Sequence, residues 1–395
     1  MPQPKVGIVH PRLGFGGSEA AALWAIEALK QDYSVSLITS GKVDLGRLND
    51  YYGTSLQTGE FSILKVPLPP GLRDTARFSG LRGAFVQRFC RRVAPRFDLM
   101  INTYNVCDYG APTIQLIADF SFVEDWRFTM NPPLQEWKTW WYGKTQIRKG
   151  YLQLCRAIAG KTSESWKQNL TLANSRWSAQ LMRERFGVQG EVLYPPVAHD
   201  FSDVPYADRE NGFVCIGSIV PEKRMDAIIG ILQKVRQDGY DVHLHILGSI
   251  DDSPYGKRMK ELISKGREWV FSEGRVFGQR KNKLMACHRF GINARENEPF
   301  GIVVAEMVKA GCIVFVPNGG GQTEIADHPA LIYESDDDAV RKIEAVLADS
   351  TLQTKLRTHL AQGAHRFSVG NFRQGIRKVV DEFLRGREIC SKVEG

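Results

Sequence analysis

Residues 298–306, EPFGIVVAE, carry two carboxylates eight positions apart around a Pro-Phe-Gly turn and an apolar run. We predict that a loop turns into a helix at Gly301, with Ile302 beginning the first helical turn. The N-terminus of such a helix exposes unpaired backbone N–H groups and partial positive charge, which suit a phosphate. Glu298 and Glu306 would flank this anion site, and each carboxylate accepts hydrogen bonds from neighbouring sugar hydroxyls. The stretch therefore predicts a sugar-nucleotide site, although each acid taken alone could simply be a helix-start acid that satisfies the dipole.

Cations must lie close to such a site, because the two acids and a diphosphate repel one another. Lys223 and Arg224 end the stretch GSIVPEKR (217–224), where a strand gives way to a loop. This upstream pair favours the functional interpretation of Glu298 and Glu306 over the simpler one.

The alternation of apolar runs and amphipathic segments predicts an α/β fold. KVGIVH (5–10), AAALWAIEALKQ (20–31) and YSVSLITS (33–40) form a βαβ unit, with Ser18 as the expected N-cap of its helix. A second series of strands begins at FVCIGSIV (213–220), after the Pro-Pro break of EVLYPPV (191–197). We predict two Rossmann-like, doubly wound domains over 1–197 and 198–370, followed by a terminal helix over 371–395.

The composition and the cysteine content indicate the compartment in which the protein resides. The 395 residues are 43% hydrophobic and 24% charged, as in ordinary globular proteins. The longest apolar stretch, 301–316, is interrupted by Glu306 and Lys309, and the first residues lack the apolar block of a signal peptide. The seven cysteines are scattered and odd in number, which indicates free thiols in a reducing compartment. We expect a cytoplasmic protein, and peripheral contact with the inner membrane face is the alternative that its basic segments leave open.

The net charge of +8 is concentrated in two segments without acids. Six arginines lie in 77–97, where Phe78, Leu81, Phe85, Phe89 and Val93 have helical spacing. A packed helix with a solvated rim explains the pattern, and so does contact with an anionic membrane or a phosphate-bearing acceptor. WKTWWYGK (137–144) suits an interface, a sugar platform or an aromatic core. The acidic run 336–338 is expected to be a solvated loop before a helix.

Four fragments, in order along the chain, resemble the retaining glycosyltransferases of family 4, which have the GT-B architecture of two domains facing across a cleft. They are GFGGSE (14–19), ANSRWSAQLM with VLYPPV (173–182, 192–197), IGSIVPEKRMD (216–226) and ENEPFGIVVAEMVKAG (296–311). YPPV and NEPFGI also resemble the cytoplasmic-face mannosyltransferases that extend dolichol-linked glycans.

This resemblance implies a nucleotide diphosphate sugar as donor, a glycan or lipid-linked acceptor, and no cofactor or metal. Glu298 would bind donor-sugar hydroxyls, Glu306 the ribose, and Lys223 the diphosphate as it leaves. Gly16 and Gly17 would let the backbone approach the donor phosphate. The implied backbone donors are the amides of Phe300, Gly301, Ile302 and Val303.

Two positions depart from the family pattern. Ser218 stands where relatives usually carry an Arg that binds phosphate, so Arg224 is a candidate replacement. The stretch TIQLIADF (113–120) lies where relatives often carry a His near the reacting carbon, and here Ala118-Asp119 stands instead. Asp119 would orient the acceptor hydroxyl or the donor sugar. No His/Asp cluster with the spacing of metal ligands is visible in the sequence.

Two other functions stay open. An NAD-dependent dehydrogenase is disfavoured, because GFGGSE lacks the G-x-G-x-x-G spacing and no acid falls where a ribose partner is expected. A basic nucleic-acid-binding module is suggested only by the arginine-rich segment. The run Gly319–Gly321 could line the same cleft or serve as flexible packing.

Overall fold

The computed structural model describes residues 2–72, 78–123, 146–160, 164–198, 201 and 204–393, with side chains up to residue 386. The chain divides into two compact units. The described residues up to Phe122, those of 146–196 and those from Ser368 onward form unit 1, and Val123 with the described residues of Val197–Phe367 forms unit 2. This division falls after Pro196, beside the expected boundary at 197, and it places the terminal helix in unit 1.

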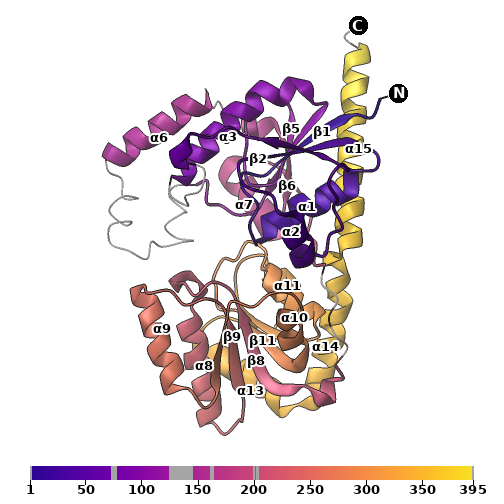
Figure 1. The fold of residues 1–395 in the computed structure, drawn as a ribbon. Helices are drawn as coiled ribbons and strands as arrows, with labels where there is room; N and C mark the ends of the chain where they lie inside the picture. The colour runs from indigo at the N-terminus through magenta and orange to yellow at the C-terminus, as the bar shows by residue number, and fades with distance from the viewer. Residues whose placement is uncertain are drawn as a thin grey trace. The chain divides into compact units, whose positions relative to one another are not determined.

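Unit 1 is built on a parallel sheet (Figure 1). Every residue of its two central strands, LMIN and TIQLI, is buried, as expected where helices cover both faces of a parallel sheet. In spatial order the strands are β3 (Ser62–Lys65), β2 (Ser34–Thr39), β1 (Lys5–Val9), β4 (Leu99–Asn102), β5 (Thr113–Ile117), β6 (Leu170–Ala173) and β7 (Gly190–Val192). The order reverses between β1 and β4, which makes this the switch point of the unit.

The helices of unit 1 join these strands and close with the end of the chain. They are α1 (Gly17–Leu29), α2 (Leu45–Tyr52), α3 (Ser79–Val93), α6 (Gln146–Ala159), α7 (Arg176–Phe186) and α15 (Val369–Val393). Residues Ala20–Leu29 of α1 are all buried, and α15 packs against this helix (Figure 1). Arg377 fastens the contact, because its guanidinium donates to the Ala28 carbonyl at 2.5 Å and pairs with Asp32 at 3.0 Å.

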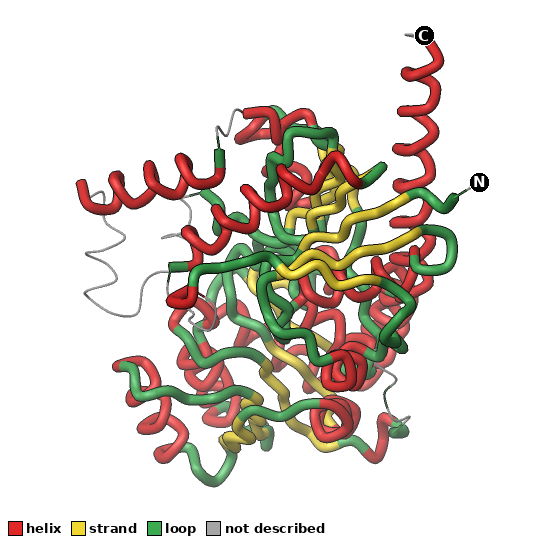
Figure 2. Tube along the Cα trace, turned by 45° about the horizontal axis from the view of Figure 1, so that its top comes forward, coloured by secondary structure: helices red, strands yellow, loops and turns green. Residues whose placement is uncertain are grey.

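Unit 2 repeats the architecture with a second parallel sheet; in Figure 2 the strands of each unit lie together with helices around them. In spatial order its strands are β10 (Val270–Gly274), β9 (His243–Leu247), β8 (Glu210–Ile216), β11 (His288–Ile292), β12 (Ile313–Pro317) and β13 (Ile332–Tyr333). The rings of Phe213 and Phe290 stack 5.0 Å apart, centroid to centroid, and Phe315 lies beside them in the core. This order reverses between β8 and β11.

The helices of unit 2 lie between its strands in sequence. They are α8 (Met225–Gln237), α9 (Pro254–Lys265), α10 (Gly278–Cys287), α11 (Ile302–Lys309), α12 (Thr323–Ala326), α13 (Asp336–Ala348) and α14 (Ser350–Ala364). The predicted helix start at Gly301 is confirmed, since α11 begins at Ile302.

Three local predictions are wrong. The N-cap of α1 is Gly16, and the Ser18 hydroxyl instead donates to the Glu19 carboxylate at 2.9 Å. The acidic run 336–338 is the first turn of α13 rather than a loop, because the Ser335 side chain caps this turn and acids there complement the helix dipole. Phe78 precedes α3 with a φ of +57° and is 51% exposed, so it is not part of the packed face.

The basic segment forms an amphipathic helix with a mixed set of arginine environments. In α3, Arg82 is buried and Arg91 pairs with Asp108 at 3.1 Å. Arg88, Arg92 and Arg96 are exposed. Arg77 and the stretch 137–144 lie outside the described residues. Within the described part of the chain, no helix combines the length and apolar character needed to cross a bilayer.

Candidate functional site

The predicted donor residues of unit 2 gather at its switch point. β8 and β11 are neighbours, and the loops after Ile216 and Ile292 carry the predicted cation and the first predicted acid. In open parallel sheets, ligands bind outside the carboxyl ends of the strands at such a point.

Lys223 and Glu298 meet directly at this edge. The Lys223 Nζ lies 2.7 Å from Glu298 Oε2, although 75 residues separate them in the chain. Arg295 approaches the same carboxylate, with its NH1 3.3 Å from Oε1 and 3.2 Å from Oε2. The three side chains are 18%, 12% and 15% exposed, so the cluster is largely withdrawn from water yet reachable.

The charge state of Glu298 follows from these neighbours. Burial alone would raise its pKa, but the charges and hydrogen bonds of Lys223 and Arg295 outweigh burial and hold the pKa below its usual value. Glu298 is therefore ionised at neutral pH and can only accept hydrogen bonds, which is what sugar hydroxyls require.

The start of α11 lies in the loop that carries Glu298. Gly301 has a φ of +92°, a conformation that residues with a side chain rarely adopt. Its carbonyl accepts a hydrogen bond from the Ala305 amide at 3.1 Å, which forms the first turn of the helix. The amides of Ile302 and Val303 precede this first full helical bond, so they belong to the donors that a helix leaves for an anion. The Phe300 ring packs into the unit against Phe367, with centroids 5.4 Å apart. Its side chain is therefore structural, and only its backbone could face a ligand.

The glycine run after β12 fixes the backbone of Glu298. Gly320 pairs with Glu298 in a parallel bridge, and the Gly321 amide donates to the Glu298 carbonyl at 2.8 Å. A Cβ at Gly320 would lie 2.3 Å from that carbonyl oxygen, so glycine is required for this approach. The Gln322 side chain adds a bond of 2.7 Å to the Arg295 carbonyl. These contacts hold in place the loop that presents both Arg295 and Glu298.

Glu306 is held by a different cation. Its Oε1 lies 2.9 Å from Nζ of Lys281 on α10, and the two side chains are 9% and 5% exposed. Because Cα–Cβ bonds in a helix tilt toward its N-terminus, Glu306 leans toward the first turn of α11. The two acids of the opening motif thus belong to two separate ion pairs.

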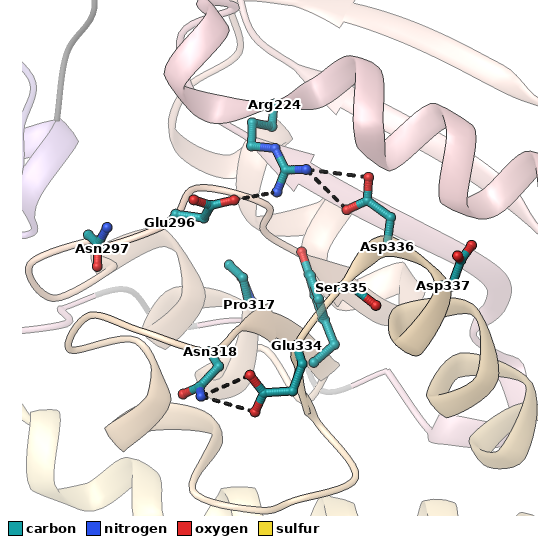
Figure 3. Close-up of a pocket in the computed structure, with 10 residues that line it drawn as sticks. Arg224, Glu296, Asn297, Pro317, Asn318, Glu334, Ser335, Asp336 and Asp337 are labelled. Atoms are coloured by element: carbon teal, nitrogen blue, oxygen red, sulfur yellow. Dashed lines mark hydrogen bonds and ion pairs between the residues drawn. The ribbon is translucent and has the colours of Figure 1, made fainter. Parts of the chain in front are cut away.

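Arg224 and Ser218 do not join the Lys223–Glu298 contact. The Arg224 guanidinium bridges Glu296 at 2.9 Å and Asp336 at 3.1 Å, as Figure 3 shows. It lines a cavity of about 510 Å³ whose acids, including Glu334, outnumber it. This charge balance disfavours a diphosphate there. Ser218 is exposed after β8.

The glycine loop of unit 1 follows β1 at the corresponding switch point. Gly16 is the N-cap of α1, and its amide donates to the Tyr52 hydroxyl at 2.7 Å. A Cβ at Gly16 would lie 2.7 Å from an oxygen of Glu19, so the loop folds closely around this acid. Gly17 begins the helix. His10, which sequence analysis did not single out, is buried beside the loop with Nε2 3.3 Å from the Ser18 hydroxyl. Burial lowers the pKa of His10, against an opposing effect of Glu19.

Asp119 follows β5 in the same unit and is fixed within its own turn. Its Oδ1 accepts from the Asn105 side chain at 2.7 Å and from the Ser121 amide at 2.9 Å. The Asp119 backbone amide in turn donates to the Asn105 side-chain oxygen at 3.0 Å. The carboxylate is therefore oriented before any ligand binds.

Sequence analysis missed Arg295 and Lys281. Arg295 stands three residues before Glu298, so its presence in NARENEPFG was a usable signal. Lys281 lies on α10 among other basic residues, and nothing nearby in the sequence distinguishes it.

Residues 199–366, which contain this whole cluster, match the family model described as glycosyl transferases group 1. These residues form a group 1 glycosyltransferase domain. Among characterised proteins, the chain is 24% identical over 251 residues to the GDP-Man:Man(3)GlcNAc(2)-PP-Dol alpha-1,2-mannosyltransferase of Dictyostelium discoideum, covering 56% of this chain and 50% of that protein. The enzyme of the same name from Yarrowia lipolytica is 22% identical over 368 residues, or 80% of this chain and 57% of the relative. The chain thus spans about half the length of the curated relatives it matches.

Solved structures confirm the predicted fold class. The chain aligns over 97% of its length with all of a sucrose-phosphate synthase from Thermosynechococcus elongatus, with a TM-score of 0.70 and 12% identity. It aligns over 96% with all of Anabaena HepE in complex with UDP and glucose, with a TM-score of 0.66 and 15% identity. The fold is GT-B, with two Rossmann-like parallel-sheet domains.

Proposed function

We propose that the chain is a retaining hexosyltransferase that moves mannose, or a related hexose, from a nucleotide diphosphate sugar to a lipid-linked glycan. The observation that carries the proposal is the contact of Lys223 and Arg295 with Glu298, beside the N-terminus of α11. The names of the relatives support GDP-mannose as donor and a lipid-linked glycan as acceptor.

The donor would be held at three points. The diphosphate would lie against the first amides of α11 and the Lys223 ammonium, where the helix dipole and the cation both favour negative charge. Glu298 would accept hydrogen bonds from hydroxyls of the donor sugar, and Glu306 from those of the ribose. The contact with Lys281 holds the Glu306 carboxylate in place for that role.

The reaction would proceed by charge stabilisation at the leaving group. The bond from the sugar C1 to the phosphate oxygen breaks, and the acceptor oxygen bonds to C1 on the same face. The acceptor proton passes to the departing phosphate, so the sequence of bonds balances without a protein nucleophile. Lys223 and Arg295 would stabilise the charge that grows on the diphosphate, which is where preorganised cations lower a barrier most. Arg295 thereby supplies the second cation that the family pattern places at Ser218.

Unit 1 would supply the acceptor side. Gly16 and Gly17 would bring the backbone at the start of α1 close to a phosphate, and the Asp119 carboxylate would accept a hydrogen bond from the attacking hydroxyl. Membrane contact would come from α3 and α6, which pack together (Figure 1). Arg88 and Arg92 are exposed on α3, and Ile147 and Leu154 are 55% and 52% exposed on α6. Cations beside exposed apolar residues suit an anionic lipid surface in the cytoplasm.

A thermal-shift panel tests the donor assignment. GDP-mannose, UDP-glucose, NAD⁺ and a short DNA duplex would be compared on the parent chain and on Lys223→Ala, Glu298→Gln and Glu306→Ala. We expect one nucleotide sugar to stabilise the parent, because a ligand stabilises the state it binds, and we expect all three variants to lose the response. Lys234→Ala, which removes an exposed cation of the same unit, serves as the control. Equal responses in the parent and in Glu298→Gln would refute the site, and stabilisation by NAD⁺ alone would refute the donor class.

A further inference from the structure

Three histidines and a glutamate converge in unit 2, at the end of the sheet opposite the Lys223–Glu298 contact. They lie at or near the amino ends of β8, β9 and β11, and their potential ligand atoms are all within 4.8 Å of one another. We call Glu210, His243, His245 and His288 the histidine cluster.

Strand register builds the histidine cluster. His243 and His245 are two residues apart on β9 and therefore share one face of the sheet. In the parallel register Glu210 on β8 pairs with His288 on β11, and Gly212 on β8 pairs with His243. A Cβ at Gly212 would lie 2.3 Å from Nε2 of His243, so the missing side chain makes room for that imidazole above β8.

The spacing of the donor atoms fits a tetrahedral metal ion. Nε2 of His243 lies 3.1 Å from Nε2 of His288 and 3.2 Å from Oε2 of Glu210. The third edge, from His288 Nε2 to Glu210 Oε2, is 3.8 Å. Tetrahedral zinc with bonds of about 2.0–2.1 Å places its ligand atoms roughly 3.3–3.4 Å apart. One ion would therefore fit among these three atoms after shifts of a few tenths of an ångström, and the ligand atom of His245, within 4.8 Å of them, would move inward to take the fourth position.

The hydrogen-bond partners of the Nδ1 atoms also favour a metal site. Nδ1 of His288 lies 2.6 Å from the Leu284 carbonyl, and Nδ1 of His245 lies 2.8 Å from the Glu273 carboxylate. A histidine that donates Nδ1–H to a carbonyl or carboxylate presents an unprotonated Nε2, and metal-binding histidines are usually held in this way. Glu273 is fixed in turn by Arg280 at 2.7 Å.

We propose that the histidine cluster binds one Zn²⁺ ion through the three imidazoles and the Glu210 carboxylate. The ion would tie together three strands at their amino ends. Its role is structural, because the donor residues lie at the carboxyl ends of the same sheet. The sequence shows only the pair His243 and His245, because Glu210 and His288 lie more than 30 residues away and strand register alone brings them to that pair.

The test is zinc binding by the full chain, purified without a polyhistidine tag and stripped with EDTA. Calorimetric titration and elemental analysis should give one Zn²⁺ per chain, and Zn²⁺ should raise the melting temperature. His243→Gln should weaken binding roughly 100-fold or more, and the outer variant Glu273→Gln roughly 10–100-fold. Cobalt substitution should give the intense visible absorption of a tetrahedral site.

Two further variants keep the test decisive. His359→Gln is the matched control, because this ring on α14 packs against His328 and lies outside the cluster. Glu210→Gln changes a side chain that is 56% exposed, so it tests a ligand without disturbing the core. No zinc binding by the parent would overturn the proposal and leave the cluster as a hydrogen-bonded network. Equal affinities in His243→Gln, Glu210→Gln and His359→Gln would also overturn it, as metal bound elsewhere.

Discussion

Lys281→Met tests how much the Lys281–Glu306 ion pair contributes to stability, apart from the ligand role proposed for Glu306. The substitution keeps an apolar stem of similar length and removes the ammonium that lies 2.9 Å from the Glu306 carboxylate. Both side chains are less than a tenth exposed, so water cannot replace the lost partner.

The size of the effect follows from this burial. Unit charges 2.9 Å apart attract by about 6 kcal/mol at an effective dielectric constant of about 20. Desolvation and side-chain ordering offset part of that attraction, and losing one member of a buried pair typically costs about 3–5 kcal/mol. We therefore expect unit 2 to lose about 3–5 kcal/mol of unfolding free energy, which lowers its melting temperature by roughly 6–20 °C.

Urea unfolding and thermal melts of four proteins measure this cost. They are the parent, Lys281→Met, Glu306→Gln and the double variant. The double variant should lose less than the sum of the single variants, with a coupling of about 1–3 kcal/mol. Lys283→Met on the same helix is the control, because Lys283 is exposed and its loss should change stability by less than about 0.5 kcal/mol. A cost below about 1 kcal/mol for Lys281→Met, or full additivity in the double variant, would show that this ion pair does not hold Glu306.

Three other outcomes test the surroundings of the site. Gly320→Ala should cost at least about 2 kcal/mol in urea unfolding, from the clash with the neighbouring backbone and a φ of +80°, whereas Gly239→Ala, with positive φ but open space around it, should cost less. The lowered pKa of Glu298 means that its ion pairs stabilise unit 2 above a pH of about 4.5 and lose that contribution as the pH falls through the native pKa. Unfolding free energy measured from pH 6 to pH 3 should therefore fall more steeply in the parent than in Glu298→Gln. Arg377→Ala should cost about 1–3 kcal/mol and speed hydrogen exchange along α15, and unchanged exchange would show that its pair with Asp32 does not anchor the helix.

The strands and the anion-binding turn could be predicted because their causes are local. Buried parallel strands appear in the sequence as continuous apolar runs, so FVCIGSIV predicted β8. Gly301 marked the start of α11 because a positive φ is most easily adopted by glycine. Both the second strand series and the helix beside Glu298 follow from residues within a few positions of one another.

What the sequence did not disclose depends on residues that meet only in the folded chain. Lys281 and Glu306 lie on different helices, and a buried partner cannot be inferred from a basic residue in a polar stretch. Ser18 resembles an N-cap, but the helix starts at Gly17, so its hydroxyl bonds to Glu19 instead. The acids at 336–338 form a helical turn because the Ser335 side chain caps it, and three consecutive acids do not by themselves distinguish such a turn from a loop.

The burial of α1 on all sides has a consequence for biosynthesis. Residues Ala20–Leu29 of α1 are all buried, so this helix cannot be fully packed until the last element that covers it has been synthesised. That element is α15, which begins at Val369. At about 5–20 residues per second, a ribosome needs roughly 17–70 s to travel from Leu29 to Val369. During this interval apolar surface of α1 is exposed in the nascent first unit, and we expect chaperones to bind it. Residues Val197–Phe367 of the second unit are all synthesised before α15, so that unit can fold before the first is complete.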